Sequence, residues 1–308
     1  MMKLRDYIDL ALECNGMVLQ FGRAVSGERR EFGITKIEGL ESSELEVTTT
    51  DNALVDGSTV SGKRIRSRTV HLEATLRDDR NNAQHRQQII KFFNPKHTGT
   101  LMVEHSGTKR KVAYELEGWT FAATDSVLGQ LSIVVDMKCP DPFFKGLDDF
   151  GRNMAEISKH IAFPWRVVRT KVPVPEPYGA LALPGQITGY RSLTRNVYLP
   201  NDGDVPAPLR IKFTAERGPC TNPKILLGRT GRFVRVRAEM QKGDVLVVDT
   251  DRRHQVIELN GVNVYQKIDR LSEPFELAVG DNYLMYDADE NYTNLDVWLY
   301  YTPRYLGV

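Results

Sequence analysis

The chain has 308 residues, of which 41% are hydrophobic and 26% charged, and its formal net charge is +1. This length predicts about two domains, and the near-neutral charge gives no overall electrostatic reason to expect nucleic-acid binding. The 3 cysteines, Cys14, Cys139 and Cys220, are too widely spaced for a disulfide framework or a zinc site, which favours reduced, buried thiols. No apolar run reaches the ~20 residues of a membrane span, and charged residues within the first thirteen argue against a signal peptide, so we expect no membrane partner.

The first part of the chain has the residue pattern of β-strands. Ile8, Leu10 and Leu12 alternate with other residues, which predicts a strand, although a short helix over residues 4–13 fits the same spacing. Asn15-Gly16 predicts a tight turn. Further strands are expected at residues 32–37, 45–48, 65–76, 101–105, 111–120 and 131–137. His71 falls on the polar side of its strand, where a solvated histidine is the better prediction than a zinc ligand.

Residues 51–63 interrupt these strands with Gly, Ser, Asp and Asn, which predicts an exposed loop or an extended hairpin. Val55 and Val60 lie within this segment. Their side chains either pack against their own domain or are presented to a neighbouring subunit. The residue pattern alone favours packing against the parent domain.

One helix is expected over residues 80–93, with Asp79 as its N-cap and Pro95 beyond its end. The apolar face predicted for it consists of Ala83, Gln87, Ile90, Phe92 and Phe93. Its other face is basic and is expected to be solvated rather than to bind phosphate. Residues 1–138 therefore predict a mainly β domain, a β-sandwich with one packed helix.

The segment Cys139-Pro140-Asp141-Pro142-Phe143-Phe144 separates this pattern from the rest of the chain. Proline fixes φ and cannot donate to a sheet, so the two prolines end a strand and stiffen the chain after it. The two phenylalanines are too apolar for an ordinary solvated linker. Residues 139–146 are thus predicted to be a stiff junction that holds two domains in a set orientation.

Residues 147–308 predict a second β-sandwich, of jelly-roll type, that starts with a Pro-rich segment. Asn260-Gly261 is the strongest hairpin signal in the chain. Short strands are expected at 209–213, 224–227, 233–238, 245–249, 255–259, 262–264, 275–277, 282–286 and 297–301.

The sequence contains none of the common catalytic motifs, neither G-x-S-x-G nor H-E-x-x-H, P-loop or C-x-x-C. The carboxylate-rich string 287–291 lacks the ligand spacing of a calcium loop and is expected to be a solvated loop. We therefore expect no catalytic residue, no cofactor and no metal site. Tyrosine is frequent late in the chain and suits interfaces, sugar sites or core strands alike.

The order of these features resembles the distal tail proteins of long-tailed (siphovirus-type) phages. The resemblance rests on Phe32-Gly33-Ile34, the loop at Asp56-Gly57, the alternating strand Val70–Leu76, the helix that ends at Phe93, and the CPDPFF junction. It continues in the second half with short turn motifs, at 198–206, 243–244, 260–261, 280–282 and 303–308.

The resemblance implies a structural protein of the phage virion, made in the cytoplasm of the bacterial host. Six copies would form a ring through the N-terminal (belt) domain, with Val55, Asp56, Gly57, Val60 and Ile65 as contact residues. The ring would join the major tail tube protein to a tail-associated hub or lysin protein and let DNA pass without specific binding. The C-terminal domain would be galectin-like and would anchor receptor-binding proteins.

Two other functions are compatible with the residues. A carbohydrate-binding module would use the late tyrosines and the jelly-roll fold, although no galectin-like H-x-N-x-R string is present. A glycan hydrolase would need a pair of carboxylates, and nothing in the sequence singles out such a pair.

Overall fold

The computed structural model describes residues 8–22, 31–41, 43–52, 56–76, 82–122, 131–154, 157–159, 189–191 and 195–308. The chain divides into two compact units. Unit 1 consists of Met1–Asp149, Asp202–Ala207 and Thr302–Val308, and unit 2 consists of Phe150–Asn201 and Pro208–Tyr301. Unit 1 is thus assembled from three separate stretches, which include the residues predicted as the junction and the last residues of the chain. The predicted domain limits at 138 and 147 stay predictions.

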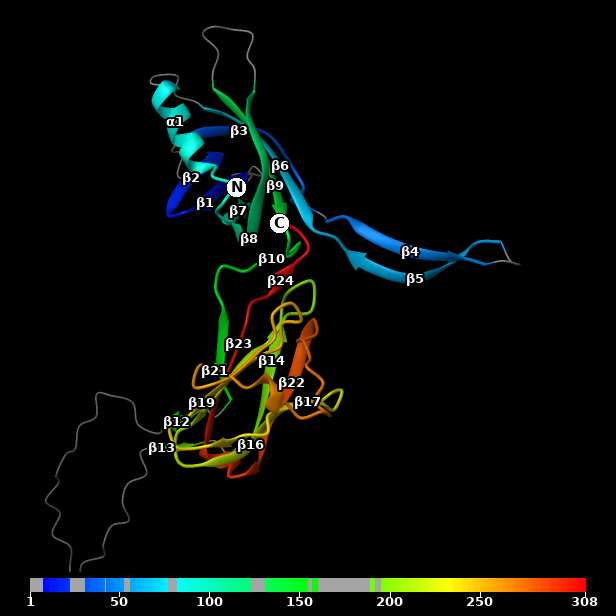
Figure 1. The fold of residues 1–308 in the computed structure, drawn as a ribbon, viewed down its shortest axis with the longest axis vertical. Coiled ribbons are helices and arrows are strands. Elements are labelled where there is room, and N and C mark those ends of the chain that lie inside the picture. Colours follow the sequence, from blue (N-terminus) through cyan, green and yellow to red (C-terminus); the bar gives the residue numbers. More distant parts are fainter. Residues whose placement is uncertain are drawn as a thin grey trace, which may run out of the picture. The chain divides into compact units, whose positions relative to one another are not determined.

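Unit 1 is built on a β-barrel (Figure 1). Its sheet runs in the order β24-β10-β8-β7-β1-β2-β3-β6-β9, and β8 also pairs with β9. The long strand β8 pairs with β7 along its first half and with β9 along its second half, so the seven strands from β8 to β9 close into a ring. The bounds are β1 (Ile8–Cys14), β2 (Met17–Gly22), β3 (Phe32–Glu38), β6 (Arg68–Leu76), β7 (Gly99–His105), β8 (Thr108–Ala122), β9 (Ser132–Cys139), β10 (Phe144–Lys145) and β24 (Arg304–Tyr305).

Alternation along the strands fills the barrel, as the sequence predicts. In β6, Val70, Leu72 and Leu76 are fully buried, and in β9 the inward residues Val135 and Met137 face the same core. Residues 8–14 form a strand and not a helix, which settles the described part of the 4–13 alternative. The predicted turn after it is confirmed, since both of its residues have positive φ.

The expected helix is present as α1 (Asn82–Phe92), but the prediction of its buried face is wrong by one position. Ile89, Phe92 and Phe93 are buried, whereas Ile90 is 42% exposed. Ile89 lies three and four residues before the two phenylalanines, so these three side chains share one face of the helix end. The proposed N-cap, Asp79, lies outside the described residues.

His71 is half-buried rather than solvated, which corrects the prediction. Its Nδ1 lies 2.6 Å from Oδ1 of Asp136 and its Nε2 lies 3.1 Å from Oε1 of Glu73. These hydrogen bonds, that to Asp136 first, raise the pKa of His71. The polar side of this strand is therefore an ordered, paired surface.

Unit 2 consists mainly of two antiparallel sheets, as a β-sandwich requires. One sheet has the order β11 (Phe150–Asn153), β23 (Leu295–Tyr301), β15 (Arg210–Ala215), β19 (Val245–Asp249), β20 (Val256–Leu259) and β21 (Val262–Asn263). The other has the order β14 (Asn196–Asn201), β22 (Gly280–Glu290), β16 (Cys220–Leu227) and β17 (Arg232–Arg235), and β18 (Glu239–Met240) also pairs with β16. The remaining elements are β12 (Ile157–Lys159) with β13 (Gly189–Arg191), and the 3₁₀ turns η1 (Tyr265–Lys267) and η2 (Tyr292–Asn294).

Two predictions for this unit are corrected. Phe275 and Leu277 are buried but lie in no named strand, because their apolar character reflects burial and not strand pairing. The string expected as a solvated loop is mostly the end of β22. There Asp287 lies 3.2 Å from the guanidinium of Arg195, so a neighbouring cation compensates its charge within the sandwich.

Candidate assembly site

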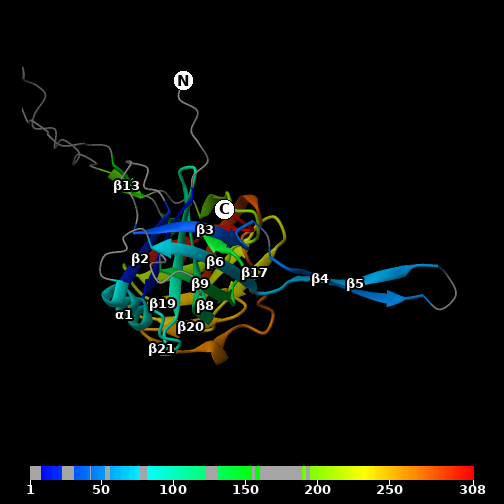
Figure 2. The ribbon, with the colours of Figure 1, turned by 90° about the horizontal axis from the view of Figure 1, so that it is seen from above.

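Strands β4 (Leu45–Asp51) and β5 (Ser58–Ile65) form a two-stranded sheet of their own, which we call the arm. The arm extends away from the barrel in both views (Figures 1 and 2). Residues 51 and 58–63 of the segment 51–63 are therefore part of an extended hairpin, whereas residues 53–55 lie outside the described residues. In the described residues each arm strand pairs only with the other, which leaves both outer edges open. An isolated two-stranded sheet is only marginally stable in water, and its unpaired edges can form hydrogen bonds with a further strand.

One face of the arm is apolar. The register pairs Leu45 with Ile65, Val47 with Lys63, and Thr49 with Val60, so the aliphatic side chains of both strands share this face. Leu45 is 62%, Val47 44% and Val60 50% exposed. Val60 is therefore not packed against its own domain, which excludes that alternative for this residue.

The opposite face of the arm is charged and internally paired. Nη2 of Arg66 lies 3.1 Å from Oε1 of Glu46, and Arg64 also donates a hydrogen bond to Glu46. These hydrogen bonds, that from Arg66 first, lower the pKa of Glu46 from 4.5 to about 2. The ion pairs favour the paired register of the two strands and leave the other face for contact with a partner.

The predicted contact residues lie along β5 and at its start. Asp56 and Gly57 are exposed before the strand, where Gly57 has a φ of 101° that favours glycine. Ile65 is half-buried at the base of the arm, and Val55 lies outside the described residues. Sequence reasoning did not single out Leu45 and Val47 as exposed aliphatic residues of the arm, although their alternation with Glu46 already indicated a strand with one apolar face.

Arg68, which is only 1% exposed, holds the base of the arm in place. Its guanidinium donates to the backbone carbonyls of three distant segments, to Gly39 at 2.6 Å, to Pro142 at 2.9 Å and to Leu306. It also lies 4.7 Å from the centroid of the Phe144 ring. Burial lowers the pKa of this guanidinium, which nevertheless stays protonated. We call these five residues the Arg68 cluster.

The end of the chain packs beside this cluster. Tyr305 in β24 pairs with Phe144 in β10, and the guanidinium of Arg110 lies 3.7 Å from the centroid of the Tyr305 ring. Arg110 also donates a hydrogen bond to the carbonyl of Gly307. A Cβ on Gly307 would lie 2.4 Å from the carbonyl oxygen of Glu41, so the chain end fits closely against the segment that leads into the arm.

The predicted junction residues lie within unit 1. Cys139 ends β9 and Phe144 begins β10, and both are fully buried, so burial raises the pKa of the Cys139 thiol to about 11. Pro142 is buried and supplies a carbonyl to Arg68. Asp141 pairs with Lys145 at 3.1 Å, while Pro140 is exposed and Phe143 half-buried. A role of this segment in setting the orientation of two domains stays a prediction.

The described part of the chain has neither a metal-ligand group nor a membrane-spanning helix. Within it, no three His, Cys, Asp or Glu side chains are grouped so that they could hold a metal ion, and no helix is long and apolar enough to cross a membrane. The late tyrosines are divided between core and surface: Tyr286 and Tyr301 are buried, whereas Tyr198 is 64% exposed.

Comparison with known proteins gives a family match for one part of the chain. Residues 202–305 match the family model described as the siphovirus-type tail component, C-terminal domain. This match agrees with the family that the sequence predicts. No curated protein sequence matches the chain.

A solved structure shares the fold of this chain. SPP1 Dit (gp 19.1), described as a paradigm of the hub adsorption apparatus in phages that infect Gram-positive bacteria, has a TM-score of 0.64 and 14% identity. The match covers 96% of this chain and 99% of that protein. The activated baseplate of phage P2 gives TM-scores of 0.46 with Ca and 0.45 with Sr, both at 9% identity, and each match covers 97% of this chain and 98% of that one. The mainly β fold is thereby confirmed.

Proposed function

We propose that this protein is the hub of a phage baseplate, in which six copies close a ring through unit 1. The observation that supports it is the arm. Its exposed aliphatic face and its two open strand edges would both be covered by a neighbouring copy. A ring needs head-to-tail contacts that close, and an arm that extends from one side of each copy suits such a contact.

In this proposal the ring joins the major tail tube protein to a tail-associated hub or lysin protein, and unit 2 anchors receptor-binding proteins. DNA passes through the centre of the ring without specific binding, which agrees with a net charge of +1. The protein is made in the cytoplasm of the bacterial host and functions in the virion. The role is structural and needs no catalytic residue or cofactor.

Shortening the arm tests the proposal. Removal of residues 51–63 should weaken ring assembly more than folding, but it also deletes most of β5. A better variant replaces residues 46–64 with Asn-Gly, which removes both valines of the apolar face. A two-residue turn can join Leu45 and Ile65 because they are cross-strand partners. We expect the wild-type protein to form six-fold rings in electron micrographs and the variant to elute as a folded protomer with a circular dichroism spectrum that stays mainly β.

Two outcomes would contradict the proposal. If the shortened protein still forms intact rings, the arm is not part of the contact between copies. A wild-type protein that stays monomeric and binds glycans would favour the carbohydrate-binding module, and glycan hydrolysis that is lost on replacing one carboxylate would favour an enzyme.

A further inference from the structure

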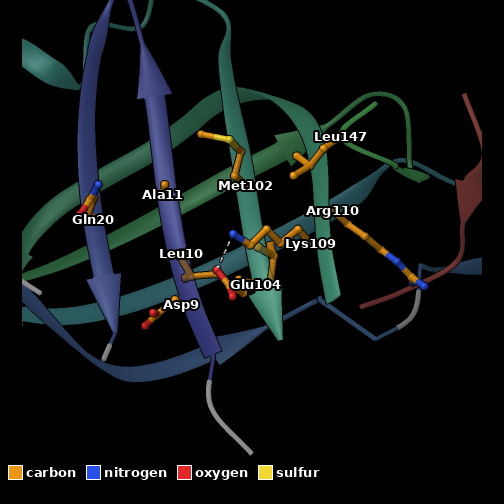
Figure 3. A pocket seen from close by; sticks show the side chains of 10 residues that line it. Asp9, Leu10, Ala11, Gln20, Met102, Glu104, Lys109, Arg110 and Leu147 are labelled. Carbon is orange, nitrogen blue, oxygen red and sulfur yellow. Dashed lines mark ion pairs between the residues drawn. The ribbon is translucent and has the colours of Figure 1, made fainter. Parts of the chain in front are cut away.

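A cavity of about 210 Å³ lies on the outer face of the barrel, over β1, β7 and the start of β8 (Figure 3). Ala11, Met102 and Leu147 give it an apolar lining. Leu147 lies in the segment after β10, and Nζ of Lys111 donates to its backbone carbonyl at 3.0 Å, which fixes this segment beside β8. Leu147 is itself 38% exposed, so apolar surface continues to the mouth of the cavity.

The arm leaves the barrel on the other side. It is inserted between β3 and β6, which are neighbours in the barrel. In one direction around the barrel β2 separates β3 from β1, and in the other direction β9 and β8 separate β6 from β7. In Figure 1 β1 and β2 lie to the left and the arm points to the right. A contact surface and its complement on opposite sides of one copy are what a head-to-tail ring requires.

The faces over β3, β6, β9 and the end of β8 are poor partners for an apolar arm. Over β3, β6 and β9 the outer side chains are charged and already paired, as in Lys36 with Glu38 at 2.9 Å and His71 with Asp136 at 2.6 Å. At the end of β8 the surface is covered by α1, where Phe93 lies 5.4 Å from Trp119 between ring centroids. Covering these pairs with aliphatic groups would cost desolvation energy without new hydrogen bonds, whereas the Glu104–Lys109 pair at the cavity can meet charges that the arm itself carries.

The charges around the two surfaces are complementary. Asp9 and Glu104 are direct cross-strand neighbours at the cavity, and Lys109 lies beside them on β8, 3.4 Å from Glu104 (Figure 3). On the apolar face of the arm, Lys63 lies opposite Val47 towards the base, and Asp51 lies towards the tip. Because Asp9 is only 5% exposed, Glu104 is the acidic side chain that the cation of the arm can reach, and Lys109 on β8 can meet the anion of the arm.

We propose that the cavity over β1, β7 and β8 receives the apolar face of the arm of a second copy of this chain. The proposal rests on the proposed ring and names the surface at which it closes. Val47 and Val60 of one copy lie against Ala11, Met102 and Leu147 of the next. Each copy gives one arm and receives one, so the contact repeats until the ring closes.

Cross-linking of the full-length protein tests this pairing directly. The native cysteines Cys14, Cys139 and Cys220 are at most 4% exposed, so engineered thiols react selectively. Rings of Val60→Cys, Met102→Cys double variants, treated with a short bismaleimide, should give a ladder of covalent oligomers up to six copies. The matched pair Thr59→Cys, Met102→Cys moves the arm thiol to the opposite face, because Thr59 pairs with Thr50, and should give at least fivefold less product.

A charge placed in the cavity gives a second test. Met102→Glu should raise the protein concentration needed for half-assembly by more than about tenfold, since its carboxylate would be buried under the arm while its cross-strand partner Lys111 already donates to the carbonyl of Leu147. Thr100→Glu, on the same side of β7 but outside the cavity lining, should change it less than about twofold.

The results separate this proposal from the ring itself. Suppose that wild type forms rings but the cysteines at positions 60 and 102 do not cross-link. The cavity is then not the receiving surface, although the ring still stands. A stronger cross-link in the Val60→Cys, His71→Cys double variant would lead to the same conclusion. Equal effects of the Met102 and Thr100 variants would overturn the cavity as well. If wild type forms no rings, the proposed function fails first.

Discussion

Arg68 is a buried cation that donates hydrogen bonds to three backbone carbonyls from separate parts of the chain. Arginine suits this position because its planar guanidinium carries five donors in a fixed geometry and stacks on an aromatic ring, here Phe144. The sequence contained a signal for it, since Arg68 has the same parity as the inward residues Val70 and Leu72 of its strand. A charged residue at an inward position indicates a buried polar partner, but the acceptors are backbone carbonyls that no side-chain pattern reveals.

Replacing Arg68 should therefore loosen the base of the arm. Arg68→Met leaves three carbonyls without their donor, and we expect the free energy of opening of the β6 and β9 amides to fall by about 3 kcal/mol, because uncompensated buried polar groups are costly. Hydrogen exchange with mass spectrometry measures it. Arg66→Met is the matched control two residues away, with a side chain 52% exposed, and should cost less than about 1 kcal/mol. Equal losses in both variants would mean that Arg68 has no special role.

Glu46 gives the arm a defined pH dependence. Because Arg66 and Arg64 lower its pKa from 4.5 to about 2, the pairing stabilises the arm fully above pH 4.5 and is lost as the pH falls through about 2. A carboxyl ¹³C titration by NMR should place the Glu46 transition near pH 2. Arg66→Ala should move the transition towards 4.5, and by more than Arg64→Ala does, since the hydrogen bond from Arg66 is the larger cause. A wild-type transition near 4.5 would show that the ion pairs do not form in solution.

At the scale of elements, the sequence predicted what depends on local pattern and missed what depends on pairing. The alternation in β6 and the Asn15-Gly16 turn fix their own structure, so both could be read directly. The segment 51–63 was ambiguous, because Gly and Ser residues are compatible with a loop and with an exposed ribbon. Its register, and with it the apolar face of Leu45, Val47 and Val60, depends on the partner strand. The receiving cavity could not be predicted, because β1, β7 and the segment of Leu147 meet only in the folded unit.

At the scale of the whole molecule, the last residues of the chain complete the first unit. Residues 302–308 belong to unit 1, although the chain passes through unit 2 before it reaches them. Arg68 and Leu306, which share a hydrogen bond, are 238 residues apart in the sequence. Bringing together two residues this far apart in the sequence costs loop-closure entropy, so the contact forms late in folding. Unit 1 therefore needs residues 302–308 for its full set of contacts.

Removal of residues 304–308 should consequently affect unit 1 and spare unit 2. The truncation deletes β24, takes one acceptor from Arg68 and removes the ring that packs on Arg110. We expect faster hydrogen exchange at residues 139–145 and in β6, with unchanged exchange in β15 and β23. Gly307→Val tests the same contact in a chain of full length, because its Cβ would lie 2.4 Å from the carbonyl oxygen of Glu41. Exchange that rises equally in both units would contradict the assignment, and unchanged exchange in unit 1 would show that the chain end contributes nothing to its stability.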